Sequence, residues 1–332
     1  MKRIAILGAG GMGTALALLF ARGARPVTLW ARDPERAEHL GRTRVNDRHL
    51  PGVALPPNIQ VHANACEATA AADLIVAAIP SAYLRATLDQ LAERLPPGVP
   101  VLSVVKGIEF GTFARPSQVV VETLGPRSVA ILSGPSHAEE FARGLPASVV
   151  VAGPDAALNA RVRDALNRDA FRVYTNADGP GVELAGALKN ILGLAAGVCD
   201  GLQFGDNAKA SLLTRGLAEM SRFAAHLGAR PSTFYGLAGV GDVVTTCYSP
   251  FGRNRALGER IGRGASLEQA TSGAVSVAEG VPTTRSVHAL ASREGIEMPI
   301  TAELHKILFE GKSPRIAVVD LMDRDPKDEW PS

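Results

Sequence analysis

The sequence has few cysteines, few aromatic residues and no long uninterrupted apolar run. Its three cysteines, at positions 66, 199 and 247, are too few and too widely spaced to indicate a disulfide framework or a zinc site. The histidines also lack metal-ligand spacing, so we expect no bound metal. No apolar run approaches the roughly 20 residues that span a bilayer, and we therefore expect no membrane insertion.

An excess of charge of one sign is missing as well. The 35 Lys and Arg residues nearly balance the 33 Asp and Glu residues, which leaves a net charge of +2. This balance gives no reason to expect nucleic-acid binding. An apolar strand pattern begins at Ile4, which leaves no room for a signal peptide, and we expect a cytoplasmic protein.

Lysine is the scarce cation of this chain. The 332 residues include 28 arginines and only 7 lysines, so arginine is the ordinary positive charge here. A lysine inside an apolar stretch is therefore predicted to serve a purpose that arginine cannot serve, such as losing its proton.

A glycine-rich turn lies between the first apolar run and the next. Residues 4–7 predict a buried strand, and residues 14–20 predict a helix. Between them, Gly8 permits a tight turn, Gly10 lets a pyrophosphate approach the backbone, and Gly13 lets helix and strand pack closely. The helix N-terminus then offers unpaired N–H groups to phosphates. The alternative is a loop without a ligand, but a strand before the turn and a helix after it favour dinucleotide binding.

The end of the second strand, predicted at residues 26–30, bears on the choice of cofactor. Folds that prefer NAD usually place an acid there, but this chain has Ala31 and then Arg32. Arg32 fits a 2′-phosphate, which favours NADP(H) over NAD(H). The alternative is that Arg32 is an ordinary solvated residue and that Asp33, the predicted N-cap of a helix, holds the ribose.

The remaining pattern predicts an α/β protein with two domains. Apolar strands alternate with helices, which indicates a Rossmann-type, doubly wound, mostly parallel sheet with ligands at the carboxyl ends of its strands. From residue 179 on, the pattern is almost wholly helical. We expect a nucleotide-binding domain at 1–178 and an all-α substrate-binding domain at 179–332. The other predicted strands are 59–62, 73–79, 101–105, 129–132, 148–152 and 171–174; the predicted helices include 81–95, 182–199, 207–227, 279–293 and 302–309; and 46–59 is predicted to be a loop.

Lys189 is the strongest single candidate for chemistry. Its helical neighbours three and four residues away are Ala185, Gly186, Leu192 and Gly193, so the amine lies on a close-packed apolar face. Burial disfavours the charged form of a lysine, which makes this residue a candidate proton acceptor. The alternative is a lysine that extends its amine to solvent from a core helix.

Three further candidates come from strand ends and polar clusters. Lys106 follows a predicted strand and points to the expected cleft, although a solvated lysine fits that position equally well. Asp242 lies among apolar residues and glycines and therefore needs a partner, such as Lys189, unless it caps a helix. Arg253 and Asn254 offer donors suited to a phosphate, or else begin a surface helix. His137 is predicted to begin a helix.

Together these stretches resemble the NAD(P)-dependent glycerol-3-phosphate dehydrogenases in their bacterial form. The resemblance extends over essentially the whole chain. One departure is Gly11-Met12, where bacterial members commonly carry Ser or a similar residue followed by an aromatic residue. The stretches that carry the resemblance are 8–13, 105–107, 133–136, 186–190, 214–220, 239–246, 252–255 and 297–300.

The resemblance implies reversible NAD(P)H-dependent reduction of dihydroxyacetone phosphate to sn-glycerol 3-phosphate for phospholipid synthesis, by a cytoplasmic enzyme that is often a homodimer. It implies that Lys189, Lys106 and Asp242 are catalytic. It implies substrate contacts at Lys106, Gly134, Ser136, Lys189, Asn190, Asp242, Thr246, Gly252, Arg253 and Asn254. The cofactor positions, including those of the glycine turn, are Gly8, Gly10, Gly11, Met12, Gly13, Arg32, His49, Lys106, Ala138, Arg253, Val277 and Glu279.

Two other functions stay open on the sequence alone. The same Lys-Asn pair suits a related two-domain dehydrogenase that acts on a β-hydroxy acid or on ketopantoate. A protein that binds NADP(H) as a sensor, without turnover, would need the glycine turn but not a buried Lys189.

Overall fold

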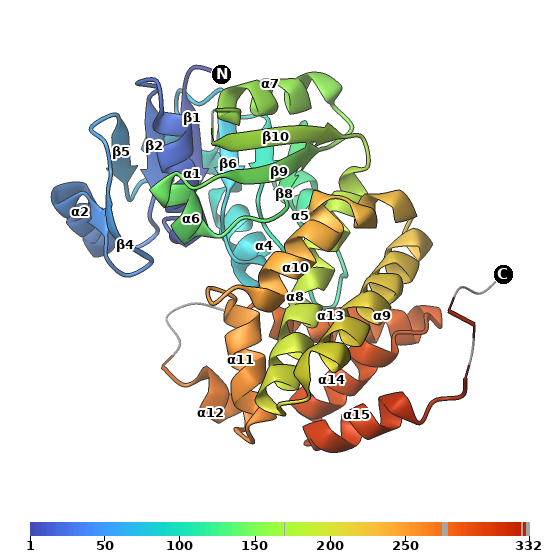
Figure 1. Cartoon of the computed structure of the whole chain (residues 1–332). Coiled ribbons are helices and arrows are strands. Elements are labelled where there is room, and N and C mark those ends of the chain that lie inside the picture. Colours follow the sequence, from blue (N-terminus) through green and yellow to red (C-terminus); the bar gives the residue numbers. More distant parts are fainter. Residues whose placement is uncertain (169, 274–277, 327, 330–332) are drawn as a thin grey trace.

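The computed structural model describes residues 1–168, 170–273, 278–326 and 328–329. An eight-stranded sheet and its helices form one half of the molecule, and a cluster of helices forms the other half (Figure 1). The strands in sheet order are β10 (Phe171–Asn176), β9 (Ala147–Ala152), β8 (Val129–Ser133), β7 (Val101–Ser103), β6 (Leu74–Ala77), β1 (Ile4–Leu7), β2 (Val27–Trp30) and β5 (Ile59–His62).

Helices cover both faces of this sheet because successive residues of central strands such as β1, which point to opposite faces, are apolar. Ile4 and Ile6 of β1 belong to one buried cluster, and Ala5 and Leu7 belong to another on the opposite face. The first cluster includes residues of α1, α2, α6 and α7, and the second includes residues of α3, α4 and α5. These helices are α1 (Gly11–Ala21), α2 (Pro34–Thr43), α3 (Ala65–Thr69), α4 (Ser81–Leu91), α5 (Pro116–Leu124), α6 (Ala138–Arg143) and α7 (Ala156–Leu166).

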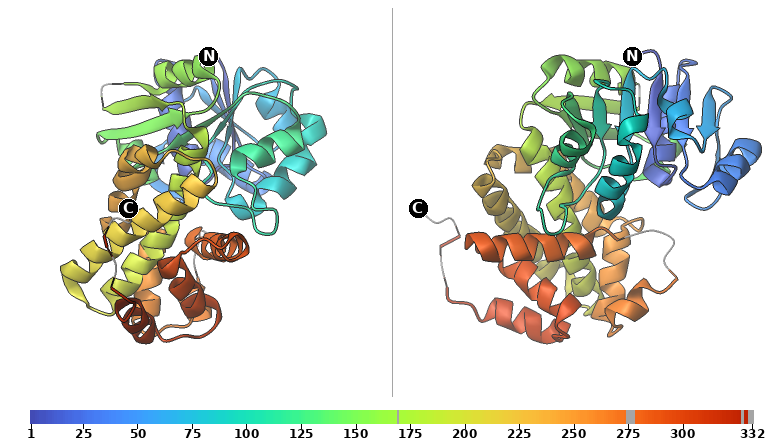
Figure 2. Two further views of the ribbon diagram at one scale, coloured as in Figure 1. Left: turned by 90° about the vertical axis from the view of Figure 1, so that its right-hand side faces the viewer. Right: turned by 180° about the vertical axis from the view of Figure 1, so that it is seen from behind.

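The second half is helical throughout the residues that the structure describes. Two long helices, α8 and α9, and the shorter helices after them lie below the sheet in Figure 1 and appear from two further sides in Figure 2. This arrangement confirms the predicted fold class. The helices are α8 (Gly179–Gly201), α9 (Gly205–His226), α10 (Asp242–Tyr248), α11 (Arg253–Gly262), α12 (Leu267–Thr271), α13 (Gly280–Glu294), α14 (Pro299–Phe309) and α15 (Pro314–Met322).

Helix α8 requires a correction to the expectation about apolar length. It has 23 residues and a mean hydropathy of 1.4 over its most apolar window, which suffices by length and composition to cross a membrane. However, 94% of that window is buried inside the molecule. The helix is apolar because it is surrounded by protein on all sides.

Two glycines let α8 and α11 approach closely. A Cβ on Gly197 of α8 would lie 2.0 Å from the carbonyl oxygen of Arg255, and a Cβ on Gly258 of α11 would lie 2.0 Å from that of Leu194. Only glycine tolerates such contact between two backbones. The close approach places the first residues of α11, Arg253 and Asn254, beside α8.

The predicted loop at 46–59 is wrong. This segment contains most of an antiparallel hairpin, β3 (Val45–Asn46) and β4 (Leu50–Ala54). Its turn-rich composition indicated a loop, but Leu50 is buried in the same cluster as α1. The Asn46 side chain also donates to the carbonyl oxygen of Ala9 at 3.0 Å and to Thr14 Oγ1 at 2.7 Å. These tertiary contacts, which the composition does not reveal, hold the hairpin against the glycine turn.

One strand pair departs from the parallel pattern. β9 runs antiparallel to β8, and β10 runs parallel to β9. The helix between β8 and β9 is α6, which has only six residues. The antiparallel pairing means that the chain does not cross to the opposite end of the sheet between these two strands. The chain therefore re-enters the sheet from the same end.

Candidate active site

The glycine turn lies at the point where the strand order reverses. β1 pairs with β2 on one side and with β6 on the other, so the crevice beyond Leu7 and Ala77 is the expected dinucleotide site. Gly8 has a φ of +118°, and a Cβ there would lie 2.5 Å from the carbonyl oxygen of Ala78. A Cβ on Gly13 would lie 1.9 Å from the carbonyl oxygen of Gly8.

The space around this turn fits a pyrophosphate. A Cβ placed on Gly10 would meet no described atom within 4 Å, so the backbone is open there. No described side chain caps the N-terminus of α1, and its first turn contains no acidic residue. The N–H groups of that turn are therefore available to an anion.

Three cofactor candidates from distant parts of the chain meet beside the turn. A Cβ on Gly11 would lie 3.1 Å from the backbone oxygen of His49 and 3.6 Å from the Cβ of Ala138. This proximity gives a physical reason for glycine at position 11. Met12 packs against the cluster of buried residues that includes α1. Burial, with the charges of nearby arginines, lowers the pKa of His49 to about 4.

Arg32 lines an open cleft beyond the end of β2. The cleft has a volume of about 620 Å³. Asp33, the alternative ribose ligand, is the N-cap of α2 as predicted, and its Oδ1 accepts from the backbone N–H groups of Glu35 and Arg36. The residues that line the cleft are Trp30, Arg32, Ala63, Asn64, Ala65, Gln90, Leu91 and Arg94.

A single buried carboxylate holds two lysine amines at the junction of the two halves. Lys106, which follows β7, places its Nζ 2.5 Å from Oδ2 of Asp242. Lys189 of α8 places its Nζ 3.0 Å from Oδ1 of the same residue. Asp242 is the first residue of α10 and is 1% exposed, and Lys189 is 9% exposed. The predicted pairing of Asp242 with Lys189 is confirmed, and the pairing with Lys106 was not predicted.

Burial and charge act in opposite directions on this cluster. Burial raises the pKa of Asp242, but the charges of Lys106 and Lys189 outweigh burial, and the net pKa is lowered. Burial lowers the pKa of Lys106 to about 8, although Asp242 opposes the shift. Near neutral pH the carboxylate is therefore ionised, and Lys106 titrates close to the physiological range.

Hydroxyl and carbonyl groups complete the contacts of the two amines. Lys106 Nζ donates to Ser136 Oγ at 3.0 Å and to the carbonyl oxygen of Gly134 at 3.1 Å. Lys189 Nζ donates to Thr246 Oγ1 at 2.5 Å. Gly134 has a φ of +118°, which favours glycine, and this turn directs its carbonyl oxygen to Lys106. Gly134, Ser136 and Thr246 thus lie in the cluster.

The two predicted asparagines form a second polar layer. Asn254 Nδ2 donates to Asn190 Oδ1 at 3.0 Å, and Asn254 Oδ1 accepts from the backbone N–H of Gly280 at 2.9 Å. Asn190 Nδ2 donates to the carbonyl oxygen of Lys106 at 3.4 Å. These bonds connect α8, α11, α13 and the segment after β7.

Arg253 and Gly252 lie at the start of α11. Gly252 is the N-cap, and a Cβ there would lie 2.7 Å from the carbonyl oxygen of Thr246. Arg253 is exposed, and its charge contributes to the lowered pKa values of Lys106 and His49. Its guanidinium therefore lies near both the lysine cluster and the glycine turn.

Glu279 contacts the sheet half directly. Its carboxylate accepts from the backbone N–H of Ser81 at 3.0 Å and from the Ser81 hydroxyl, at the N-terminus of α4. Burial raises the pKa of Glu279. The other cofactor candidate from this segment, Val277, lies outside the described residues.

Comparison with known proteins shows the family. The model described as "NAD-dependent glycerol-3-phosphate dehydrogenase N-terminus" matches residues 3–159, and the corresponding C-terminus model matches residues 178–319. The chain belongs to this family. It is 48% identical over 329 residues to a curated glycerol-3-phosphate dehydrogenase (NAD(P)+) of Chlorobium limicola, which covers 98% of this chain and 99% of the relative. A relative from Streptomyces coelicolor is 45% identical, with 98% of each chain covered.

Solved structures of the family have the same fold. Glycerol-3-phosphate dehydrogenase from Coxiella burnetii matches with a TM-score of 0.94 and 37% identity, covering 97% of this chain and 99% of that chain. A ketopantoate reductase from Ralstonia eutropha matches with a TM-score of 0.61 and 16% identity, covering 96% and 99%. The second match shows a shared fold alone, so the comparisons favour the glycerol phosphate family over the ketopantoate alternative.

Several residues that hold this dehydrogenase site together were missed from the sequence. Glu183 precedes Lys189 by six residues in α8, is 2% exposed, and accepts hydrogen bonds from Arg115 and Ser117. A glutamate in an apolar helix needs a partner when buried, and that signal was available. The Ser81–Glu279 contact has no comparable sequence signal, because the two residues are 198 positions apart.

Proposed function

We propose that this chain catalyses the reversible NAD(P)H-dependent reduction of dihydroxyacetone phosphate to sn-glycerol 3-phosphate. The observation that carries the proposal is the pair of lysine amines on Asp242, at 2.5 and 3.0 Å, at the junction of the sheet and helical halves. Lys106, Lys189 and Arg253 outnumber the one carboxylate of the cluster, so the site attracts a phosphorylated substrate. The Chlorobium limicola relative carries the name of this activity.

The bound nicotinamide cofactor supplies the chemistry of hydride transfer. Lys189 is proposed to transfer the proton: its Nζ gives a proton to the alkoxide that forms at C2 during reduction, and takes the hydroxyl proton during oxidation. Asp242 and Thr246, which both contact that Nζ, fix its direction. Lys106 stabilises the negative charge that develops on the same oxygen.

The N-terminus of α11 is proposed to hold the substrate phosphate. Arg253 supplies a planar set of donors, and Asn254 lies one residue further on. α11 has ten residues, begins with no acidic residue in its first turn, and has no described side-chain cap. Its free N–H groups therefore favour an anion.

The cofactor is proposed to lie along the glycine turn, with Gly8, Gly10, Gly11, Met12 and Gly13 at its pyrophosphate. His49 and Ala138 border Gly11, and Glu279 approaches from the helical half. NADPH is proposed as the preferred form, because Arg32 and Arg94 both line the cleft beyond β2.

The remaining proposals concern the whole chain. We keep the division into a cofactor domain at 1–178 and a substrate domain at 179–332, which the end of β10 at Asn176 and the start of α8 at Gly179 support.

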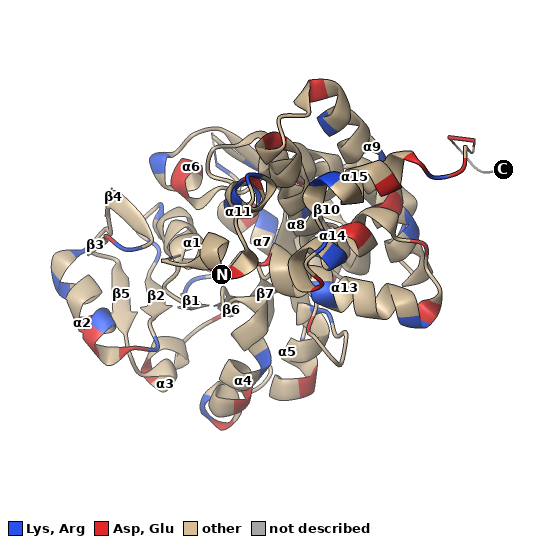
Figure 3. Cartoon of the chain, turned by 90° about the horizontal axis from the view of Figure 1, so that it is seen from below, with Lys and Arg blue, Asp and Glu red and all other residues tan. Residues whose placement is uncertain are grey.

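Three free cysteines suit the reducing cytoplasm. A homodimer supplying phospholipid synthesis follows from the family, and light scattering tests the dimer. Lys, Arg, Asp and Glu are interspersed over both halves, which supports the absence of a nucleic-acid partner (Figure 3).

The test is oxidation of NADPH and NADH, followed by absorbance, with dihydroxyacetone phosphate as acceptor. Lys189→Ala is expected to lower kcat by about 10²- to 10⁴-fold while nucleotide binding stays unchanged. Lys306→Ala removes a half-exposed lysine of α14 and serves as the control. Turnover with ketopantoate but not with the triose phosphate would favour the related dehydrogenase. Nucleotide binding without any turnover would favour a sensor.

A further inference from the structure

Residues 106–117, here called the strap, comprise most of the connection from β7 to α5 together with the first two residues of α5, and they contact the helical half. Lys106 begins the strap and reaches Asp242 of α10. Ile108 is buried in the hydrophobic cluster of the helical half. The guanidinium carbon of Arg285 of α13 lies 5.4 Å from the centre of the Phe110 ring. That of Arg293, also in α13, lies 4.8 Å from the centre of the Phe113 ring. The strap thus packs on both halves, since Ala114 is buried in the cluster of α3, α4 and α5.

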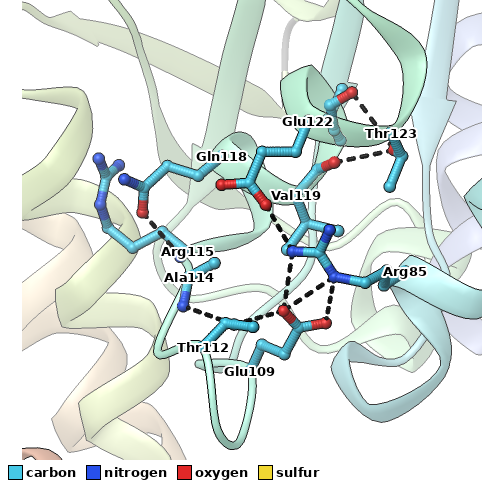
Figure 4. A network of polar contacts seen from close by, with 10 residues as sticks. Arg85, Glu109, Thr112, Ala114, Arg115, Gln118, Val119, Glu122 and Thr123 are labelled. Carbon is cyan, nitrogen blue, oxygen red and sulfur yellow. Dashed lines mark hydrogen bonds and ion pairs between the residues drawn. The ribbon is translucent and has the colours of Figure 1, made fainter.

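A partly buried ion pair between Arg85 and Glu109 fixes the strap to the sheet half. Arg85 of α4 holds Glu109 with two nitrogens: Nε lies 2.9 and 3.0 Å from the two carboxylate oxygens, and Nη2 lies 2.9 Å from Oε2 (Figure 4). Thr112 Oγ1 donates to the same Oε2 at 2.5 Å. Nη2 of Arg85 also contacts Glu122 of α5 at 2.6 Å. A bidentate pair of this kind fixes direction as well as distance.

The far end of the strap is fixed to the catalytic helix. Glu183 of α8 accepts from Arg115 Nη1 at 2.8 Å, and from the backbone N–H and the hydroxyl of Ser117, both at 2.7 Å. α8 also carries Lys189, so one helix holds both the strap and the second amine of the cluster. The two carboxylates, Glu109 and Glu183, therefore help to fix the position of the strap, which begins with Lys106, relative to α8, which carries Lys189.

We propose that Glu109, held by Arg85, is a positioning residue that keeps the amine of Lys106 on Asp242, with Glu183 as the second anchor of the same strap. The kinetic test of this inference rests on the proposed function. The position of the Lys106 amine does not, and it can be tested without turnover. Glu109 lies three residues after Lys106 and acts through the backbone.

A lysine side chain needs such support. Its four carbon–carbon torsions rotate freely, and catalytic groups must be held to about 0.5 Å of their working geometry. Lys106 Nζ already makes three contacts, with Asp242, Ser136 and Gly134. Those contacts keep the amine in place only while its backbone stays at a fixed distance from α10. The Arg85–Glu109 pair maintains that distance on a segment that belongs to no strand or helix from residue 104 to 115, although the backbone of Glu109 bonds to Phe113 and Ala114.

The kinetic test is a double-mutant cycle on the pair. Arg85→Met and Glu109→Gln are each expected to lower kcat by about 10- to 100-fold, with the KM for NADPH unchanged. The double variant Arg85→Met/Glu109→Gln is expected to be about as slow as the slower single variant, because each change already breaks the Arg85–Glu109 pair. Arg163→Met, the same exchange in the exposed Arg163–Asp164 pair, is the control and should keep full activity. Additive losses in kcat would overturn the proposal.

A second measurement requires no turnover. The chain has seven lysines, so ¹³C-methylation of the amines gives few NMR signals, and Lys106→Arg identifies that of Lys106. In the unaltered protein this amine should titrate near its pKa of about 8. In Glu109→Gln the midpoint should move upward, toward that of a solvated lysine, because the loosened strap lets water reach the amine.

These readouts separate the possible failures. Wild-type protein without triose phosphate turnover would refute the proposed function and leave the NMR test intact. An unchanged Lys106 midpoint in a folded Glu109→Gln protein would refute the positioning role. Should Glu109→Gln not fold, Thr112→Val removes one bond to the same carboxylate, and a Lys106 midpoint that does not move upward in that variant would also refute it.

Discussion

Asp242 shows how one residue sets the properties of its neighbours. Its carboxylate is 1% exposed and faces two amines, and it stays ionised because their charges outweigh its burial. It is the charged partner of both amines, which also bond to the uncharged groups of Ser136, Gly134 and Thr246. The cluster of two lysines and one aspartate consequently carries a net positive charge. The pH dependence of activity is set by the amine that loses its proton first.

Lys106 should limit activity at high pH. Burial lowers its pKa to about 8, so above that pH the free enzyme loses a positive charge from the proposed substrate site. The value of kcat/KM for dihydroxyacetone phosphate should then fall by about tenfold for each pH unit above the pKa. In Lys106→Arg this limb should move to higher pH, because arginine keeps its charge. A pH profile with the same limb in both proteins would contradict the assignment.

Arg32 should determine the preferred cofactor. Arg32→Ala removes a cation from the cleft beyond β2 and should lower kcat/KM with NADPH by about tenfold, with little change for NADH. The ratio of kcat/KM for the two cofactors is the measurement, and Arg22→Ala is a control outside the residues that line that cleft. A large NADH preference in the wild type that Arg32→Ala leaves unaltered would refute NADPH as the preferred cofactor.

At the level of the helices, carboxylates that accept from backbone N–H groups at helix N-termini hold several helices in position. Glu219 of α9 accepts from the backbone N–H groups of Ile300 and Thr301 at 2.8 and 2.9 Å, at the start of α14. Asp178 caps α8 through Gly181 N at 3.0 Å, and its other oxygen accepts from Thr233 Oγ1 at 2.6 Å. Because α8 carries Lys189, its cap contributes to the geometry of the active site.

The cap of α8 should matter more than an exposed cap. Asp178→Ala leaves several buried donors without a partner and should lower the free energy of unfolding by about 2–4 kcal/mol. Asp33→Ala removes the exposed cap of α2, and its cost should stay near 1 kcal/mol. Urea denaturation of both variants gives the comparison. Equal losses would show that burial does not increase the value of the cap.

In the molecule as a whole, the hydrophobic core of the helical half extends into the sheet. Ile131, Val150 and Ala152 of the sheet belong to the same buried cluster as α8 and α10. The strap and the Ser81–Glu279 contact join the halves further. Unfolding of the helical half would expose Ile131, Val150 and Ala152 of the sheet to water, so we expect the two halves to unfold together.

Unfolding should therefore be a single transition. Trp30, in β2, reports on the sheet half when the second tryptophan is replaced in Trp330→Phe. Circular dichroism in the far ultraviolet reports mainly on helices. The two signals should change at the same temperature, and NADPH should raise both midpoints equally. Separate midpoints would show that the halves unfold independently.

Local sequence determined the elements and most of the chemistry. The apolar runs predicted every strand of the large sheet, the glycine spacing predicted the turn at the switch point, and the apolar neighbours of Lys189 predicted its burial, because each depends on residues close in the chain. The hairpin at 45–54 was missed, since buried Leu50 and the bonds of Asn46 to Ala9 and Thr14 override its turn-like composition.

Only the tertiary structure decided which charges meet. Lys106 and Asp242 are 136 positions apart, and Ser81 and Glu279 are 198 apart, so no periodicity connects them. The antiparallel direction of β9 is likewise seen only in the tertiary structure. Sequence patterns specify which groups are buried, whereas the partner of a buried charge depends on how distant segments pack.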